Sequence, residues 1–275
     1  MVDLNYCITW KKRDEKTYLR FHVNNQNDFE KLNDIDVKEI IISGLNQKFF
    51  EYFCKNFAQK FEIIQICHCN LIKDFTSFEL LNKTHFIIID WNNKATKLWN
   101  MSNNTLLKGL YFNDLMKVTV LDGIEFAPWL NEVHIDQGPD VKLFLETLIP
   151  LVKCKNLEKL DIRISGILDE NASPIVKMKS LKEANFRSTL FETEQFAMLV
   201  AKLKNVKLSP NMPYYTTDLD VKNNTFVVGK KKPWLNNTSD KLKEYEIGWN
   251  KYLKKYNAWK GTAHNRTVTV RRWSG

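Results

Sequence analysis

Motifs that usually indicate an enzyme are missing from this sequence. It has no GxSxG nucleophile motif, no HExxH zinc pair and no glycine-rich phosphate loop. The five histidines and five cysteines form no recognisable nucleophile and base arrangement either. We therefore predict a protein that is not an enzyme and that carries no cofactor.

Long apolar runs are missing as well. No stretch approaches the roughly 20 apolar residues that span a bilayer, and residues 1–10 lack the charged and apolar regions of a secretory signal. The five cysteines are an odd number without regular spacing, which is typical of reduced thiols in a cytoplasm. The sequence thus predicts a cytoplasmic protein with no membrane partner.

One cysteine-containing stretch raises the question of a metal site. Cys67, His68 and Cys69 are consecutive, and Cys54 is a conceivable further ligand. Metal clusters usually show repeated CxxC or HxxxH spacing, however, and Cys69 fills a position that the repeat described below predicts to be buried. We therefore expect no metal here.

The composition is that of a folded chain with an uneven charge. Hydrophobic residues make up 44% of the 275 positions, which is too many for a disordered protein. Residues 222–275 hold 13 Lys and Arg against 3 Asp and Glu, whereas residues 1–221 hold 28 against 29. The net charge of +9 therefore belongs to the C-terminal fifth of the chain.

A short apolar pattern recurs along the sequence. Residues 61–71, FEIIQICHCNL, place apolar residues at positions 1, 4, 6 and 11 and cysteine at position 9 of the pattern LxxLxLxx(N/C)xL. The pairs at positions 4 and 6 recur at steps of 24, 23, 23, 23, 27, 24 and 22 residues, within the period of roughly 20 to 29 for this repeat. These pairs are Ile40/Ile42, Ile64/Ile66, Ile87/Ile89, Leu110/Phe112, Val133/Ile135, Leu160/Ile162, Ala184/Phe186 and Val206/Leu208.

Over roughly residues 36–212, these repeats resemble the leucine-rich repeat family. The resemblance implies an α/β fold, a right-handed solenoid in which about eight parallel strands form one curved sheet. Position 9 holds asparagine in only one repeat, so a continuous asparagine ladder is not expected. The chain further resembles uncharacterised bacterial cytosolic repeat proteins, and small bacterial members of this kind can occur as immunity or antitoxin-like partners of a toxin or effector.

The pattern divides the chain into three parts: a β cap over residues 1–36, the solenoid over 37–212 and a basic C-terminal cap over 213–275. In the first part, Leu4–Trp10 and Thr17–Val23 alternate apolar and polar residues, which predicts a β-hairpin that caps the solenoid. Residues 261–275 are either an edge strand or an appended tail.

The spacing of apolar residues also predicts the return segments. It predicts helices over residues 47–60, 140–154 and 192–204, the last with Thr193 as its N-cap, and irregular or 3₁₀ connections over 92–107 and 117–129. Residues 239–259 should form a helix with one apolar stripe. Its outer face is basic.

The predicted binding surface is the concave face of the sheet. Residues between the apolar positions of each strand point to that face because side chains alternate across a strand. Aromatic residues and carboxylates gather in the middle, which suits a basic partner protein, and arginines follow toward the C-terminal end. The plainer alternative is an ordinary solvated face. The candidate residues are Gln65, Ile88, Asp90, Trp91, Tyr111, Asn113, Asp114, Glu132, His134, Asp136, Asp161, Arg163, Asn185 and Arg187.

The C-terminal segment provides a competing hypothesis. Its lysines and arginines alternate with tryptophan and tyrosine, so it could bind nucleic acid through the phosphate backbone and stacked bases. The aromatic residues share one helical stripe, however, and such a stripe is more often part of a core. The sequence thus favours protein binding by the concave face over nucleic-acid binding by residues 222–275.

Overall fold

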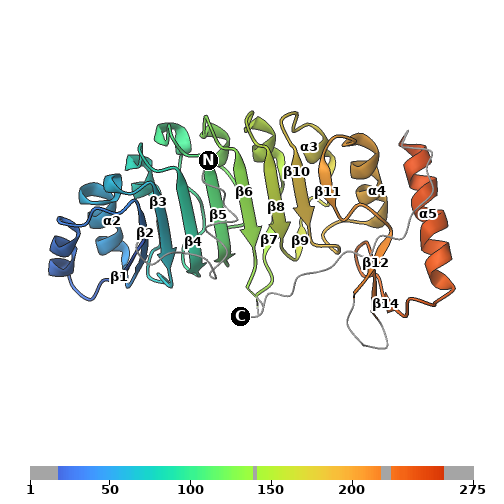
Figure 1. Cartoon of the computed structure of the whole chain (residues 1–275), viewed down its shortest axis with the longest axis horizontal. Coiled ribbons are helices and arrows are strands. Elements are labelled where there is room, and N and C mark those ends of the chain that lie inside the picture. Colours follow the sequence, from blue (N-terminus) through green and yellow to red (C-terminus); the bar gives the residue numbers. More distant parts are fainter. Residues whose placement is uncertain (1–17, 139–140, 218–223, 257–275) are drawn as a thin grey trace.

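The computed structural model describes residues 18–138, 141–217 and 224–256. Within them, nine parallel strands form one sheet whose spatial order follows the chain, and Figure 1 shows the return segments along one side of it. The predicted α/β leucine-rich repeat solenoid is confirmed. The strands are β1 Tyr18–His22, β2 Glu39–Ser43, β3 Ile63–Cys67, β4 Phe86–Asn92, β5 Gly109–Leu115, β6 Glu132–Asp136, β8 Lys159–Arg163, β10 Glu183–Phe186 and β11 Lys207–Ser209.

The apolar residues at position 4 of the repeats form one continuous column. Each is the register partner of the next across neighbouring parallel strands, and each is at most 2% exposed. A repeat therefore advances the chain by one strand, and its apolar side chains are buried between the sheet and the return segments. The column consists of Ile40, Ile64, Ile87, Leu110, Val133, Leu160 and Ala184.

The last strand has a different register from the one that the sequence predicts. Ala184 pairs with Leu208, so the last step is 24 residues rather than 22, and Ser209 rather than Lys207 lies beside Asn185. The turn after the preceding helix, in which the Val206 N–H donates to the Leu203 carbonyl, uses the extra residues. Lys207 instead begins the strand, where its ammonium lies 2.7 Å from the Glu183 carboxylate.

The strand predicted over residues 17–23 is present as β1, and the hairpin that it would form with residues 4–10 stays a prediction. β1 pairs with β2 in parallel and adds a ninth strand to the sheet. The crossover between them contains the 3₁₀ helix η1, Gln26–Leu32, whose Phe29 and Leu32 are fully buried in the same core as the repeats. A parallel pair requires such a crossover, because a tight turn can only reverse the chain. The other half of the predicted hairpin, Leu4–Trp10, lies outside the described residues.

The first return segment is helical, as predicted. α2, Gln47–Asn56, buries Phe50, Phe53 and Cys54, and the Phe50 ring meets the Phe78 ring edge-on at 4.9 Å. Other returns are short 3₁₀ helices, including the two over residues 92–107 and 117–129 for which irregular or 3₁₀ structure is predicted. They are η2 Ala58–Lys60, η3 Thr76–Leu80, η4 Met101–Asn103, η5 Ile124–Phe126 and η6 Ile149–Lys153.

The helix predicted over residues 140–154 is wrong. Of this range, the described part forms a two-residue strand, β7 Phe144–Leu145, followed by η6. β7 pairs with β9, Gly166–Ile167, in a small second sheet. The buried residues Leu143, Leu145, Leu148 and Leu151 are spaced by two and then by three, which fits an extended segment followed by a 3₁₀ turn rather than an α-helix.

The helix predicted over residues 192–204 is confirmed as α4, with one change at its N-terminus. α3 is Ser173–Val176, and α4 is Thr193–Lys202. The N-cap of α4 is Glu192 rather than Thr193, and the Glu192 N–H donates to the Gln195 side chain at 3.3 Å. The Thr193 hydroxyl is used elsewhere, because it donates to the Val228 carbonyl at 2.7 Å and so ties α4 to the C-terminal segment.

The C-terminal segment packs against the end of the solenoid. β12 Tyr214–Thr216, β13 Thr225–Val227 and β14 Trp234–Leu235 form a small antiparallel sheet, and α5, Lys241–Lys255, lies beside α4 (Figure 1). Leu242, Trp249 and Leu253 of α5 are buried, so the apolar stripe is part of a core. Among the described helices, none is long and apolar enough to cross a bilayer.

Candidate functional site

The parallel register brings the predicted concave residues into two rows. One row crosses β2 to β10 through position 5 of each repeat, and the second crosses β2 to β8 through position 7. The first row is Ile41, Gln65, Ile88, Tyr111, His134, Asp161 and Asn185, and the second is Ser43, Cys67, Asp90, Asn113, Asp136 and Arg163.

Over β2 to β4 most residues of the two rows are buried, and Ser43 and Asp90 at position 7 are partly exposed. Gln65 is 5% exposed and Ile88 is 2% exposed, so both are corrections to the predicted exposed surface. Ile88 belongs to an apolar cluster with Ile63 and Phe86, and Tyr111 packs against it. Glu132, at the first position of β6, is also buried. These three candidate residues therefore contribute little exposed surface.

The rows become polar and partly exposed from β5 to β10. We call Tyr111, His134, Asp136, Asp161 and Arg163 the concave cluster. Arg163 donates two hydrogen bonds to Asp161, at 2.9 Å and 2.7 Å, in the two-pronged geometry that gives the strongest arginine and carboxylate pairs. Asp161 also accepts a hydrogen bond from Asn185 at 3.2 Å and lies 3.7 Å from His134 Nδ1. The Asp161 carboxylate is therefore held by contacts with three neighbouring side chains.

Asp136 has a different environment from Asp161. Among the described residues, no side chain donates a hydrogen bond to its carboxylate. Burial raises the pKa of Asp136, and repulsion from Asp161 adds to this effect against the opposing charge of Arg163. Burial alone would also raise the pKa of Asp161, but the hydrogen bonds and charges of His134 and Arg163 lower it. Asp136 is therefore the carboxylate of the concave cluster that lacks a direct cationic partner.

A second polar group extends the concave cluster toward β3. Asn113 donates to Asp90 at 2.7 Å, and the Cys67 thiol lies 3.7 Å from the other Asp90 oxygen. Gln65 donates to the Cys67 sulfur at 3.3 Å. Buried and exposed candidates are thus joined in one hydrogen-bonded network, in which Asp90 and Asn113 lie at the border between the apolar and the polar part.

Two candidate residues lie past the ends of the strand rows. Trp91 and Asp114 have φ angles of 62° and 59°, as does His68, at 53°, one repeat earlier. This left-handed conformation costs energy for residues other than glycine. It turns Trp91, which is 42% exposed, against the His68 ring at 4.6 Å, and Asp114 accepts the Gly138 N–H at 3.2 Å. Trp91 thus remains available at the rim, whereas Asp114 stabilises a turn.

Of the three consecutive residues Cys67, His68 and Cys69, the two cysteines are buried and the histidine is exposed. Cys67 and Cys69 are buried, and burial raises the pKa of their thiols to about 12 and about 11. His68 is exposed and contacts Trp91. In the ranges that the structure describes, no group of three or more His, Cys, Asp or Glu is placed to hold a metal.

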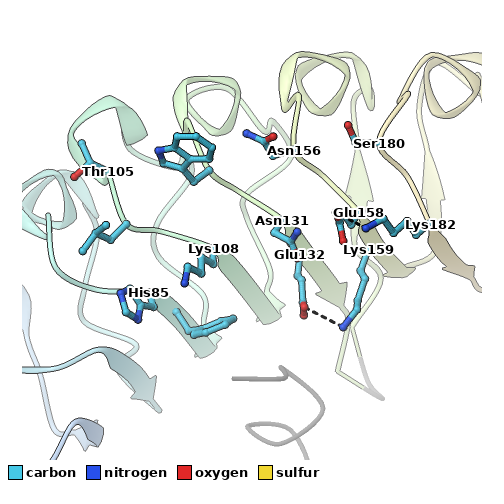
Figure 2. A pocket seen from close by; sticks show the side chains of 13 residues that line it. His85, Thr105, Lys108, Asn131, Glu132, Asn156, Glu158, Lys159, Ser180 and Lys182 are labelled. Carbon is cyan, nitrogen blue, oxygen red and sulfur yellow. Dashed lines mark hydrogen bonds and ion pairs between the residues drawn. The ribbon is translucent and has the colours of Figure 1, made fainter. Parts of the chain in front are cut away.

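The sequence analysis missed a groove at the N-terminal ends of β4 to β10. Figure 2 shows that its walls come from the residues that precede each strand and from the return segments above them. Its volume is about 640 Å³. The available signal was that ionisable residues directly precede four of the strands along the groove, at His85, Lys108, Glu158 and Lys182.

Comparisons with known proteins find likenesses among solved structures only. No protein-family model matches the sequence, and no curated protein matches it. Among solved structures, the chain is similar to an internalin from Listeria monocytogenes, with a TM-score of 0.43 and 12% sequence identity. The alignment covers 67% of this chain and 63% of the internalin chain, so this chain spans less than two thirds of that protein.

Proposed function

We propose that this protein is a non-enzymatic interaction module that binds a basic partner protein on the polar part of its concave face. The observation that carries this proposal is Asp136, a half-buried carboxylate that no described side chain neutralises directly. A lysine or arginine of a partner would supply the missing charge. A partly desolvated site makes such a pair stronger than one at an open surface.

The neighbours of Asp136 support a protein ligand. Tyr111 provides a half-buried ring 5.9 Å from the His134 ring, and exposed Trp91 lies at the rim. Aromatic side chains of this kind are the usual anchors of protein interfaces, with charged groups providing orientation. Arg187, exposed after β10, would favour an acidic group on the partner at the other end of the surface.

A narrower proposal concerns the identity of the partner. The resemblance to bacterial cytosolic repeat proteins implies an immunity or antitoxin-like role, in which the partner is a toxin or effector. A basic toxin would fit the carboxylates of the concave cluster. A toxin or effector gene beside this gene would support the narrower proposal.

The test is partner capture by the full chain and its variants. Tyr111→Ala combined with Asp136→Lys should reduce capture at least tenfold, because the double change removes the aromatic anchor and reverses the charge that would pair with a basic group of the partner. The melting temperature should stay within a few degrees. The matched control neutralises Lys231, Lys251 and Lys254, which are exposed on the C-terminal segment, and should capture the partner normally.

The second candidate is nucleic-acid binding by the C-terminal segment. Two lysines of this segment form ion pairs with carboxylates of the solenoid. Lys230 pairs with Glu170 at 2.8 Å, and Lys255 pairs with Glu194 at 2.6 Å. Exposed lysines are left on the outer face of α5. If the lysine control abolishes binding, and if binding to a nucleic acid falls steeply with added salt through counterion release, this candidate replaces the first.

A further inference from the structure

The groove at the start of the strands is lined by side chains of one cross-strand row. Phe86, Gly109 and Glu132 are register partners on β4, β5 and β6. Gly109 is buried and has no side chain, whereas Phe86 and Glu132 on either side of it line the groove.

One wall of the groove is apolar and open to solvent. Trp129 is 60% exposed and Leu106 is 44% exposed, and both line it from the return segments. Isolated apolar side chains on a surface are ordinary, but two large ones on the wall of a concave site are typical of ligand binding.

The polar wall holds a buried acceptor without a partner. The Glu132 side chain is 9% exposed, and its Oε1 atom pairs with Lys159 at 3.0 Å (Figure 2). Its Oε2 atom is buried and has no hydrogen-bond donor within the described residues. A buried oxygen of this kind costs free energy until a donor reaches it. Since Lys159 already balances the charge, a neutral N–H or O–H donor is sufficient.

The charges along the groove leave one cation unbalanced. Glu132 pairs with Lys159, and Glu158 pairs with Lys182 at 2.6 Å. Between these pairs and the N-terminal half of the sheet lies Lys108, whose exposed ammonium has no carboxylate within ion-pair distance in the described part of the chain. Burial lowers the pKa of neighbouring His85, and the charge of Lys108 lowers it further against the opposing charge of Glu62, so the charged form of His85 is disfavoured.

We propose that this groove binds an acidic, partly apolar peptide segment of a partner protein. A carboxylate of the segment would pair with Lys108, an apolar side chain would pack on Trp129 and Leu106, and a backbone N–H or a hydroxyl would donate to Glu132 Oε2. The groove crosses the starts of five neighbouring strands, a span of about 19 Å at about 4.8 Å per strand, which an extended segment of about six residues fills. This site does not depend on the concave cluster.

The test uses a phage-displayed library of random twelve-residue peptides selected on the full chain. We expect the enriched peptides to combine Asp or Glu with a large apolar residue. One enriched peptide, labelled with fluorescein, is then titrated by fluorescence anisotropy against wild type and variants. A selection that yields no enriched peptides, or peptides rich in Lys and Arg, overturns the proposal.

Matched variants locate the peptide. Lys108→Glu and Trp129→Ala should each weaken binding at least tenfold, whereas Lys117→Glu and Trp234→Ala, at exposed residues outside the groove, should stay within twofold. Glu132→Gln should weaken binding severalfold, because the amide presents a donor where the carboxylate offers an acceptor. Equal affinity for wild type, Lys108→Glu and Trp129→Ala would place the peptide elsewhere and overturn the proposal. Asp136→Lys, at the opposite end of β6 from the groove, should bind the peptide normally, which separates this site from the concave cluster.

Discussion

The concave face has two parts that share one backbone geometry and differ in chemistry. Over β2 to β4, positions 5 and 7 hold four buried residues, Ile41, Gln65, Cys67 and Ile88, and two partly exposed ones, Ser43 and Asp90. Over β5 to β10, the same positions hold Tyr111 and the charged and polar residues of the concave cluster, which are half-buried. Position in the repeat fixes the direction in which a side chain points. The neighbouring side chains decide how much of it reaches solvent.

The difference between the two parts also indicates which of them can bind a partner. An apolar row gains stability by excluding water, so changes there affect folding. In the polar row, carboxylates and an arginine remain partly hydrated, so they can exchange internal partners for external ones at lower cost. We therefore place the proposed partner surface on the polar part only.

The largest expected effect is common to both parts. Ile64→Asp and Leu160→Asp each place a charge in the fully buried apolar column and should cost about 4 kcal/mol or more, enough to abolish cooperative folding. Urea titration followed by circular dichroism measures this. If either variant has the urea midpoint of wild type, the buried column is assigned wrongly in that part of the sheet.

A smaller effect should separate the two parts. Ile88→Asp, on the buried outward row, should destabilise the protein by about 2 to 4 kcal/mol, whereas Arg187→Asp at the exposed end of β10 should change stability by about 0.5 kcal/mol or less. Gln65→Asp should also destabilise the protein, because Gln65 is buried and donates to Cys67. Equal urea midpoints for Ile88→Asp and Arg187→Asp would remove the distinction between the parts.

The smallest effect concerns two neighbouring carboxylates of the concave cluster. A raised pKa means that native Asp136 holds its proton to a higher pH than the unfolded chain, so its contribution to stability falls as the pH rises above about 4. The lowered pKa of Asp161 has the opposite sign, and its contribution is lost as the pH falls through the native pKa.

At pH 7 the two asparagine variants should therefore shift stability in opposite directions. Asp136→Asn should stabilise by up to about 1 kcal/mol, and Asp161→Asn should destabilise by about 1 to 3 kcal/mol, since it also breaks the Arg163 pair. Urea titrations at pH 7 and at pH 3 measure both, and the two differences from wild type should shrink at pH 3. Shifts of the same sign at pH 7 would contradict the assignment of Asp136 as the uncompensated group.

The sequence determined the solenoid and most of its register. Apolar pairs that recur every 22 to 27 residues are all buried when each pair stacks on the next in a parallel sheet. The same alternation predicted which residues of each strand point outward, from Gln65 to Arg163. The spacing failed at Val206/Leu208 and over residues 140–154, where the pattern is degenerate and the packing of the adjoining return segment selects the conformation.

Only the tertiary structure decided which outward residues are exposed and which charges are paired. Gln65 and Ile88 occupy the same repeat position as His134 and Asp161, and only their neighbours on adjacent strands distinguish them. The hydrogen bond from Asn185 to Asp161 and the pair of Lys159 with Glu132 join residues 24 and 27 positions apart in the chain. Burial and electrostatics are properties of the assembled neighbourhood, whereas periodicity is a property of the chain itself.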